Sequence, residues 1–356
     1  MLAALQCRLE IIRGVGHTRP LLAGFLMLQK AGVVDLDVVH RAPKPGSWTH
    51  MLTVTVNGDI RLGYDVQDGV FRPGDSPENE RYIDSLELMF ARGYVPGSYG
   101  RWEDKVRPLG LNFEVGVRHP LSVLVSHESV RTSTARLVKR ALRRAPASNL
   151  ATFERPPRGL NGGPILFLTR LWDPSDDHGP PEDTTRLNEG RVELTRAMRN
   201  AFGDRLVGGL QPTEYALRHY PGDIAPDSLT WKRSYLEMVR DADVCVTTEG
   251  LAQSTGWKFA EYVAASKPIV TEPLTYAVPG NLLEGRNYLT FRTPEECVAR
   301  VHDYLTRPEL ALQSAVANYD YHRTWARPDA LVRHTLAEAL VARVAGPAAA
   351  ALRASG

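Results

Sequence analysis

Short apolar runs rich in β-branched residues alternate with polar or glycine-rich turns and amphipathic segments along two stretches of the chain, residues 1–150 and 164–317. This rhythm is typical of parallel strands joined by crossover helices. In the first stretch it predicts a strand at 8–13, a helix at 20–31 and a strand at 35–40. The alternation at 52–56, the Asn57-Gly58 turn and the run 60–62 predict a hairpin or an edge insertion.

The second stretch repeats the same rhythm. It predicts strands at 165–169, 204–208, 243–248 and 267–271, and helices at 189–202, 234–240, 257–265 and 293–305. Thr293 and Glu296 have the spacing of a capping box, which marks the start of the last helix. Two successive sets of strands and crossover helices predict an α/β protein with two Rossmann-like domains.

Proline, glycine and asparagine are concentrated between these two stretches. We therefore interpret residues 151–163 as a linker between an N-terminal domain, 1–150, and a C-terminal domain, 164–317. The alanine-rich tail at 346–356 is expected to fray.

Composition narrows the class of protein. The chain of 356 residues has 43 Lys and Arg against 41 Asp and Glu, a net charge of +2, which argues against a protein that binds polyanions over its whole surface. Its three cysteines, Cys7, Cys245 and Cys297, are too widely spaced for a disulfide framework or a zinc site. We expect all three to be small buried hydrophobes in a reducing compartment.

The apolar runs also bear on localisation. Arg8 and Glu10 interrupt the N-terminal residues where an export signal would need an apolar core. The longest apolar run, 21–28, is far shorter than the ~20 residues that cross a bilayer. These features predict a cytoplasmic protein.

The segment 247–262 is the most informative loop, because ligands of open parallel sheets bind beyond the carboxyl ends of the strands. Thr255-Gly256 opens a helix whose free amides and dipole favour a phosphate, and Lys258 adds charge. Glu261, about one turn later, has two oxygens that suit the hydroxyls of a ribose. The alternative is a simple helix cap followed by a surface Lys258–Glu261 pair.

Residues 253–261, QSTGWKFAE, and the following 262–270, YVAASKPIV, resemble the donor-binding motif of GT-B glycosyltransferases. The resemblance implies the GT-B architecture, in which two Rossmann-like domains face each other across a cleft. It also implies that the final helices, 318–345, pack back on the N-terminal domain. The N-terminal half is similar to such enzymes mainly through segments 89–94 and 107–115.

The same resemblance implies the roles of individual residues. Glu261 would bind the ribose, and Thr255 and Gly256 would offer amides to the phosphates. Arg170 and Lys258 would neutralise charge on the leaving group without a metal ion. The remaining donor-binding candidates of this motif are Gln253 and Ser254. Gln253 stands where many retaining members carry a glutamate, and the nearby Glu249 is out of register.

Three residues of the N-terminal domain are candidates for the catalytic base. His17 follows the first predicted strand, and a histidine there could deprotonate an acceptor hydroxyl. Its alternative role is that of a polar loop residue that caps the next helix. Asp65 and Asp68 are competing bases, although the Asp68-Gly69 pair is also typical of a turn.

Two acidic segments suggest metal binding at first sight. Asp241-Ala-Asp243 has the D-x-D pattern of another glycosyltransferase class, but it joins a predicted helix to the start of a strand, at the wrong end of the sheet. We reject it as a metal site. Residues 172–178 gather three carboxylates and a histidine within a polar loop, which we interpret as a flap near the donor site. No metal site is predicted.

Residues 131–144 carry six cations and no acid, with an apolar stripe. The pattern predicts a basic amphipathic helix that packs on the surface of the N-terminal domain. Its alternative role is contact with an anionic acceptor, such as nucleic acid or a lipid headgroup, through Arg140, Arg143 and Arg144.

Together these features predict a glycosyltransferase that moves a sugar from a nucleotide sugar, first of all a UDP-sugar, to an acceptor hydroxyl. The nucleotide sugar is a co-substrate, and no further cofactor is expected. Two alternatives stay open. One is a nucleotide-sugar epimerase or phosphorylase of the same fold, and the other is a non-catalytic protein that binds nucleic acid or another ligand with a degenerate cleft.

Overall fold

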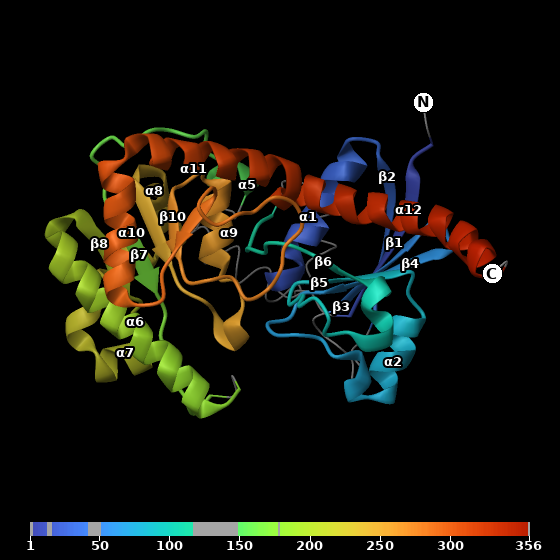
Figure 1. The fold of residues 1–356 in the computed structure, drawn as a ribbon, viewed down its shortest axis with the longest axis horizontal. Helices are drawn as coiled ribbons and strands as arrows, with labels where there is room; N and C mark the ends of the chain where they lie inside the picture. The colour runs from blue at the N-terminus through green and yellow to red at the C-terminus, as the bar shows by residue number, and fades with distance from the viewer. Residues whose placement is uncertain (1–2, 13–15, 42–50, 117–148, 177–178, 355–356) are drawn as a thin grey trace. The chain divides into compact units, whose positions relative to one another are not determined.

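The computed structural model describes residues 3–12, 16–41, 51–116, 149–176 and 179–354. The chain divides into two compact units (Figure 1). Unit 1 comprises Met1–Ser129, Tyr276–Pro279 and Thr324–Gly356, and unit 2 comprises Val130–Thr275 and Gly280–Arg323. Each unit has its own sheet and apolar core, so the predicted α/β class with two sheet-based units is confirmed.

Unit 1 contains a six-stranded sheet in the order β2-β1-β3-β4-β5-β6. The strands are β1 (Leu5–Ile11), β2 (Val34–His40), β3 (Met51–Val56), β4 (Ile60–Asp65), β5 (Leu88–Ala91) and β6 (Val106–Pro108). β3 alone runs antiparallel to its neighbours, and the other adjacent pairs are parallel. The carboxyl ends of β1, β4 and β5 therefore lie at the same edge of the sheet.

The predicted hairpin forms, but it lies in the middle of this sheet rather than at its edge. β3 pairs with β1 on one side, and β4 pairs with β5 on the other. Asn57 and Gly58 both have positive φ, as a two-residue hairpin turn requires. Five of the six residues of β4 are buried, so the hairpin is a core element and the expectation of an edge insertion was wrong.

Helices cover both faces of the unit 1 sheet. α1 (Arg19–Lys30) and α12 (Pro328–Ala354) lie side by side and share one apolar cluster with β1, β3 and β4 (Figure 1). α2 (Pro77–Asp84) belongs to a second cluster on the opposite face. A hydrogen bond of 2.9 Å between the hydroxyls of Tyr64 and Thr335 joins β4 to α12. α12 thus packs within unit 1, whereas residues 318–323 of the segment 318–345 named in the sequence analysis belong to unit 2.

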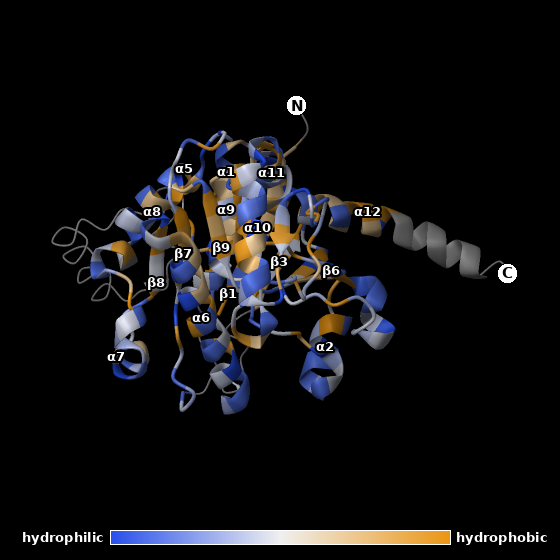
Figure 2. Cartoon of the chain, turned by 60° about the vertical axis from the view of Figure 1, so that its left-hand side comes forward, coloured by the Kyte–Doolittle hydropathy of each residue, from blue (hydrophilic) through white to orange (hydrophobic). Residues whose placement is uncertain are grey.

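Unit 2 contains a five-stranded, fully parallel sheet in the order β11-β10-β9-β7-β8. The strands are β7 (Ile165–Thr169), β8 (Leu206–Leu210), β9 (Val244–Thr247), β10 (Ile269–Thr271) and β11 (Tyr288–Thr290). Figure 2 shows hydrophobic residues along β7 and β9, which are buried on both faces. The four predicted strands are confirmed, and β11 was missed because only one of its three residues is buried, whereas all three residues of β10 are.

Within the described residues, the helices of unit 2 are α5 (Leu150–Phe153), α6 (Pro181–Phe202), α7 (Glu214–His219), α8 (Lys232–Asp241), α9 (Trp257–Ala264), α10 (Pro294–Thr306) and α11 (Pro308–Tyr321). α6 begins eight residues before its predicted start, because its first turns are exposed and lack an apolar period. Proline in the first turn, followed by Glu182 and Asp183, still favours a helix there. Thr293 caps α10 as predicted.

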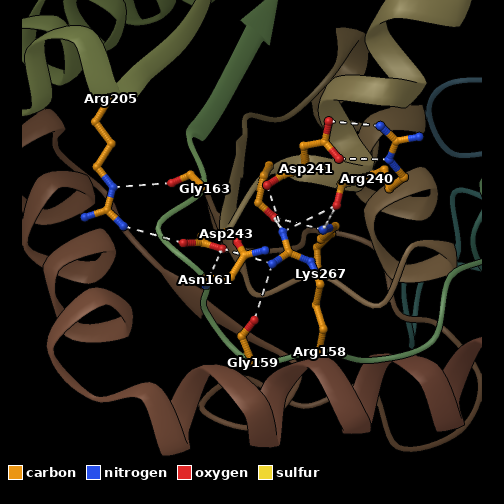
Figure 3. Close-up of polar contacts among 10 residues, drawn as sticks. Arg158, Gly159, Asn161, Gly163, Arg205, Arg240, Asp241, Asp243 and Lys267 are labelled. Carbon is orange, nitrogen blue, oxygen red and sulfur yellow. Dashed lines mark hydrogen bonds and ion pairs between the residues drawn. The ribbon is translucent and has the colours of Figure 1, made fainter.

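Asp243 lies at the amino end of β9, where it has a structural role (Figure 3). Its buried carboxylate accepts a hydrogen bond from the Asn161 amide at 3.2 Å and forms ion pairs with Arg158 and Arg205. Arg158 and Lys267 donate to the carbonyl oxygens at the end of α8. Asp241-Ala-Asp243 is therefore part of the helix-to-strand connection at the end of the sheet opposite the predicted ligand edge.

The cysteine prediction is confirmed in one respect, since Cys7, Cys245 and Cys297 are all buried free thiols. In the described part of the chain, no helix is both long enough and apolar enough to cross a bilayer.

Alanine substitutions at two helical glycines should change the free energy of unfolding in opposite directions. A Cβ at Gly24 of α1 would overlap the carbonyl oxygen of Pro328 and the side chain of Val332, whereas a Cβ at Gly190 of α6 would meet open space. We expect Gly24→Ala to destabilise the protein by about 1–3 kcal/mol. Gly190→Ala should stabilise it by about 0.5–1 kcal/mol. Urea denaturation measures both values, and equal effects would contradict the close packing of α1 and α12.

Candidate functional site

The loop between β9 and α9 forms one wall of a pocket in unit 2. Ala252 and Gln253 have φ values of 51° and 57°, so the chain turns sharply before Gly256 begins α9. The pocket lies at the carboxyl ends of β9 and β10, and its lining includes Thr248, Glu249, Gln253, Ser254, Thr255, Gly256 and Glu272. Four of the seven predicted donor-binding residues are therefore brought together: Gln253, Ser254, Thr255 and Gly256.

Arg191 is a buried cation that contacts two lining residues of this pocket, Thr248 and Glu249, and the sequence analysis missed it. It extends from α6 and donates to the hydroxyl of Thr248 at 3.1 Å and to the carbonyl oxygens of Arg170 at 2.6 Å and Glu249 at 2.5 Å. These bonds tie the segment after β7 to the segment after β9. Burial lowers the pKa of Arg191 to about 10, because the charged guanidinium is not solvated by water there.

Two carboxylates, Glu249 and Glu272, also line the pocket. The Glu249 amide donates to Oε2 of Glu272 at 2.6 Å. Burial, and then repulsion from Glu272, raise the pKa of Glu249. The pocket therefore combines helix-start amides, a neighbouring buried arginine and a pair of acids at one edge of the sheet.

Glu261 lies on α9 but is buried, and its partner is Lys232 of α8 rather than Lys258. The Lys232 ammonium donates to Oε1 of Glu261 at 2.5 Å and lies 4.9 Å from the centre of the Phe153 ring. The alternative of a surface Lys258–Glu261 pair was therefore wrong. The sequence spacing favoured that pair because i and i+3 residues share a helix face, but tertiary packing brings Lys232 closer.

The other two predicted cations have different surroundings. Lys258 is half-buried, with its ammonium 6.0 Å from the centre of the Tyr235 ring, and burial lowers its pKa to about 8. Arg170 is exposed directly after β7, and its guanidinium stacks on Trp172 with 4.1 Å between Cζ and the ring centre. Neither side chain belongs to the lining of the pocket described above, and neither does Glu261.

In unit 1, the candidate bases lie at the carboxyl edge of the sheet. Arg92, directly after β5, has a buried guanidinium whose Nη1 pairs with Asp68 and lies 3.3 Å from Nδ1 of His17. Its backbone amide donates to the carbonyl oxygen of Asp65 at 2.9 Å. The structure thus brings His17, Asp65 and Asp68 together around Arg92, which the sequence analysis did not identify.

Asp65 is the fully buried acid of this group. It lies at the end of β4, where Oδ1 accepts a hydrogen bond from the Gln67 amide at 3.1 Å and Oδ2 has no hydrogen-bond partner among the described residues. Burial raises its pKa to about 7, although the nearby Arg92 opposes the shift. Such a carboxyl group can exchange a proton near neutral pH.

The basic segment 131–144, with Arg140, Arg143 and Arg144, lies outside the described residues, as do two residues of the 172–178 loop. Within the described ranges, no cluster of three or more His, Cys, Asp or Glu side chains is arranged to hold a metal ion.

No known family model and no curated protein sequence matches the chain. Among solved structures, HepE of Anabaena in complex with UDP-glucose is 12% identical, with a TM-score of 0.45 over 95% of this chain and 99% of that one. A glycosyltransferase from Rickettsia africae is 13% identical, with a TM-score of 0.43 over 91% and 81%. UDP-GlcNAc 2-epimerase from Neisseria meningitidis is 14% identical, with a TM-score of 0.36 over 76% and 65%. The chain is thus similar, at 12–14% sequence identity, to a protein solved with UDP-glucose, a glycosyltransferase and an epimerase.

Because burial raises the pKa of Asp65, we expect the stability of the folded protein to depend on pH. Its folded pKa of about 7 is above the unfolded value of 3.8, so the folded state holds an extra proton between these pH values. Stability attributable to this group is therefore lost as pH rises through that window. From pH 5 to pH 8, the wild-type protein should lose stability relative to Asp65→Asn, by on the order of 2–4 kcal/mol. Urea denaturation at both pH values measures the loss, with Asp75→Asn at an exposed turn as control.

Arg191→Met tests the hydrogen bonds that join the segments after β7 and β9. The methionine would leave Thr248 and the carbonyl oxygens of Arg170 and Glu249 without their donor, at a cost of about 1–3 kcal/mol. Arg186→Met, at an exposed position of the same helix, should change stability by less than about 0.5 kcal/mol. Calorimetric unfolding of the two variants distinguishes them, and equal melting behaviour would show that Arg191 does not hold the two segments.

Proposed function

We propose that the protein is a GT-B glycosyltransferase that moves a sugar from a nucleotide sugar, with UDP as the nucleotide, to an acceptor hydroxyl without a metal ion. Unit 2 holds the donor, and unit 1 supplies the groups that act on the acceptor. The three buried free thiols favour a reducing compartment, the cytoplasm.

The observation that carries this proposal is the pocket at the carboxyl ends of β9 and β10. Parallel α/β sheets bind nucleotides at this edge, and the amides at the start of α9 suit a phosphate. Thr255 and Gly256 line the pocket at that helix start, while the Arg191 charge lies beneath the neighbouring loops. The amides and dipole at the start of α9 therefore favour an anion, while the charge of Arg191 offsets those of Glu249 and Glu272 in the lining.

The proposed chemistry follows from the charge that develops on the donor. Cleavage of the bond between sugar and nucleotide places negative charge on the departing diphosphate. Fixed amides at Thr255 and Gly256 can stabilise this charge, and Lys258 and Arg170 add flexible cations from α9 and from the segment after β7. Glu261 would accept hydrogen bonds from the ribose hydroxyls and would give up part of its contact with Lys232.

A second candidate function, a nucleotide-sugar epimerase or phosphorylase, is favoured by one observation. Glu249 and Glu272 place two carboxylates in the pocket, and burial raises the pKa of the first, as proton transfer at a sugar carbon would require. Incubation with UDP-sugars and product analysis by NMR distinguishes the functions. An epimerised UDP-sugar or a sugar phosphate supports the second candidate, and release of UDP with glycosylated product supports the first.

Glu261→Gln is the sharpest test of nucleotide binding, because glutamine keeps the shape of the side chain and an acceptor for Lys232. Loss of the negative charge should weaken UDP binding by about tenfold, since charge-assisted hydrogen bonds to the ribose become neutral ones. Isothermal calorimetry measures the affinity. Glu237→Gln, an exposed α8 residue paired with Arg233, is the matched control and should bind UDP like wild type. Equal affinities for the two variants would remove Glu261 from the site.

Transfer is expected to persist in excess chelator, because amides and cationic side chains replace a metal ion at the diphosphate. The measurement is UDP release with and without EDTA. Loss of turnover that manganese or magnesium restores would contradict the metal-independent assignment.

A further inference from the structure

His17 is held at two points by side chains of unit 1. Nδ2 of Asn112 donates to its carbonyl oxygen at 2.7 Å, and Arg92 contacts its ring through Nη1. Both Asn112 and Arg92 are about 6% exposed, so neither is a mobile surface group. The backbone and the ring of His17 are therefore both positioned by nearly buried residues.

The Arg92 contact fixes which ring nitrogen of His17 carries hydrogen. A guanidinium stays protonated and has only donors, so Nη1 must donate and Nδ1 of His17, at 3.3 Å, must accept. A hydrogen on Nδ1 would set two donors against each other, and an imidazolium would also place two positive charges within a few ångströms. The neutral tautomer with hydrogen on Nε2 is the one that fits.

Asp68 holds the arginine in this orientation. Nη1 of Arg92 carries two hydrogens, and the same atom pairs with Oδ1 of Asp68. The segments after β4 and β5 also touch, because a Cβ at Gly93 would overlap the carbonyl oxygen of Gly69. The carboxylate, the arginine and the ring thus form a chain of contacts between backbones that pack closely.

We infer that Arg92 is a positioning residue that keeps His17 in the Nε2–H tautomer, so that His17 donates a hydrogen bond to a substrate oxygen and is not the base. The identity of this oxygen as part of the acceptor rests on the proposed function. Removal of the hydroxyl proton then falls to a carboxylate, and Asp68 is the partly exposed one of the two neighbouring acids.

The tautomer can be measured without any substrate. Long-range ¹H–¹⁵N spectra of the free protein at about pH 8, above the reference range of histidine, report the state of each ring. His17→Gln identifies the signals of His17. We expect an unprotonated Nδ1 and a protonated Nε2 in wild type, and signals shifted toward tautomer averaging in Arg92→Met. Arg101→Met, which removes an exposed arginine of unit 1, is the matched control and should leave them unchanged.

Averaged signals in wild type, or hydrogen on Nδ1, would overturn the inference. This result does not depend on nucleotide binding, so it can fail or succeed separately from the proposed function. An Arg92→Met variant that does not fold leaves the wild-type spectrum as the deciding observation.

Turnover gives a second test if the proposed transfer occurs. Glutamine keeps an N–H donor but cannot serve as a base, whereas leucine has neither property. If His17 donates a hydrogen bond, His17→Gln should keep transfer within about tenfold of wild type, and His17→Leu should lose more. Loss of a general base costs about 10²–10⁴-fold, so a loss of that size in both variants would overturn the donor role.

Discussion

The guanidinium of Arg191 is the interaction on which the unit 2 site depends. It is buried on α6, and its three hydrogen bonds go to a hydroxyl and two carbonyl oxygens rather than to a carboxylate. Because burying a charge is costly, these acceptors must stay in place for the fold to be stable. The same bonds fix the segments after β7 and β9, which carry Arg170 and the wall of the pocket. The nearby carboxylates of Glu249 and Glu272, which line the pocket, offset part of the positive charge of Arg191.

In unit 1 as well, a buried arginine connects segments that follow different strands. Arg92 follows β5, yet it contacts His17 after β1 and Asp68 after β4. In each unit, an arginine that the sequence analysis did not single out contacts polar residues at the carboxyl edge of the sheet. The difference lies in its partners, since Arg92 pairs with an acid and Arg191 bonds to neutral oxygens.

The sequence predicted the elements with strong patterns and missed those without them. The buried runs 165–169 and 243–248 and the capped helix at Thr293 were found because apolar burial and capping are local properties. β11, which buries only one of its three residues, and the polar first turns of α6 have no such signal. The β3–β4 hairpin was recognised from its turn, but its central place depends on pairing with β1 and β5, which are distant in sequence.

In the candidate site, too, the sequence identified the residues of a local motif and missed the residues that pack against them. Residues 253–256 were identified because they follow a strand and open a helix. The partners Lys232 and Arg191 come from other helices and have no motif, so only the structure identifies them. Burial of Glu261 likewise depends on the packing of α8 against α9, which the i, i+3 spacing does not encode.

The central claim is that a nucleotide diphosphate binds at the start of α9, and amide chemical shifts test it most directly. UDP titrated into ¹⁵N-labelled protein should shift the backbone amides of Thr255, Gly256 and Trp257 most strongly and in a saturable manner. Saturable shifts confined to another part of the chain, or none at these three amides at millimolar UDP, would contradict the account.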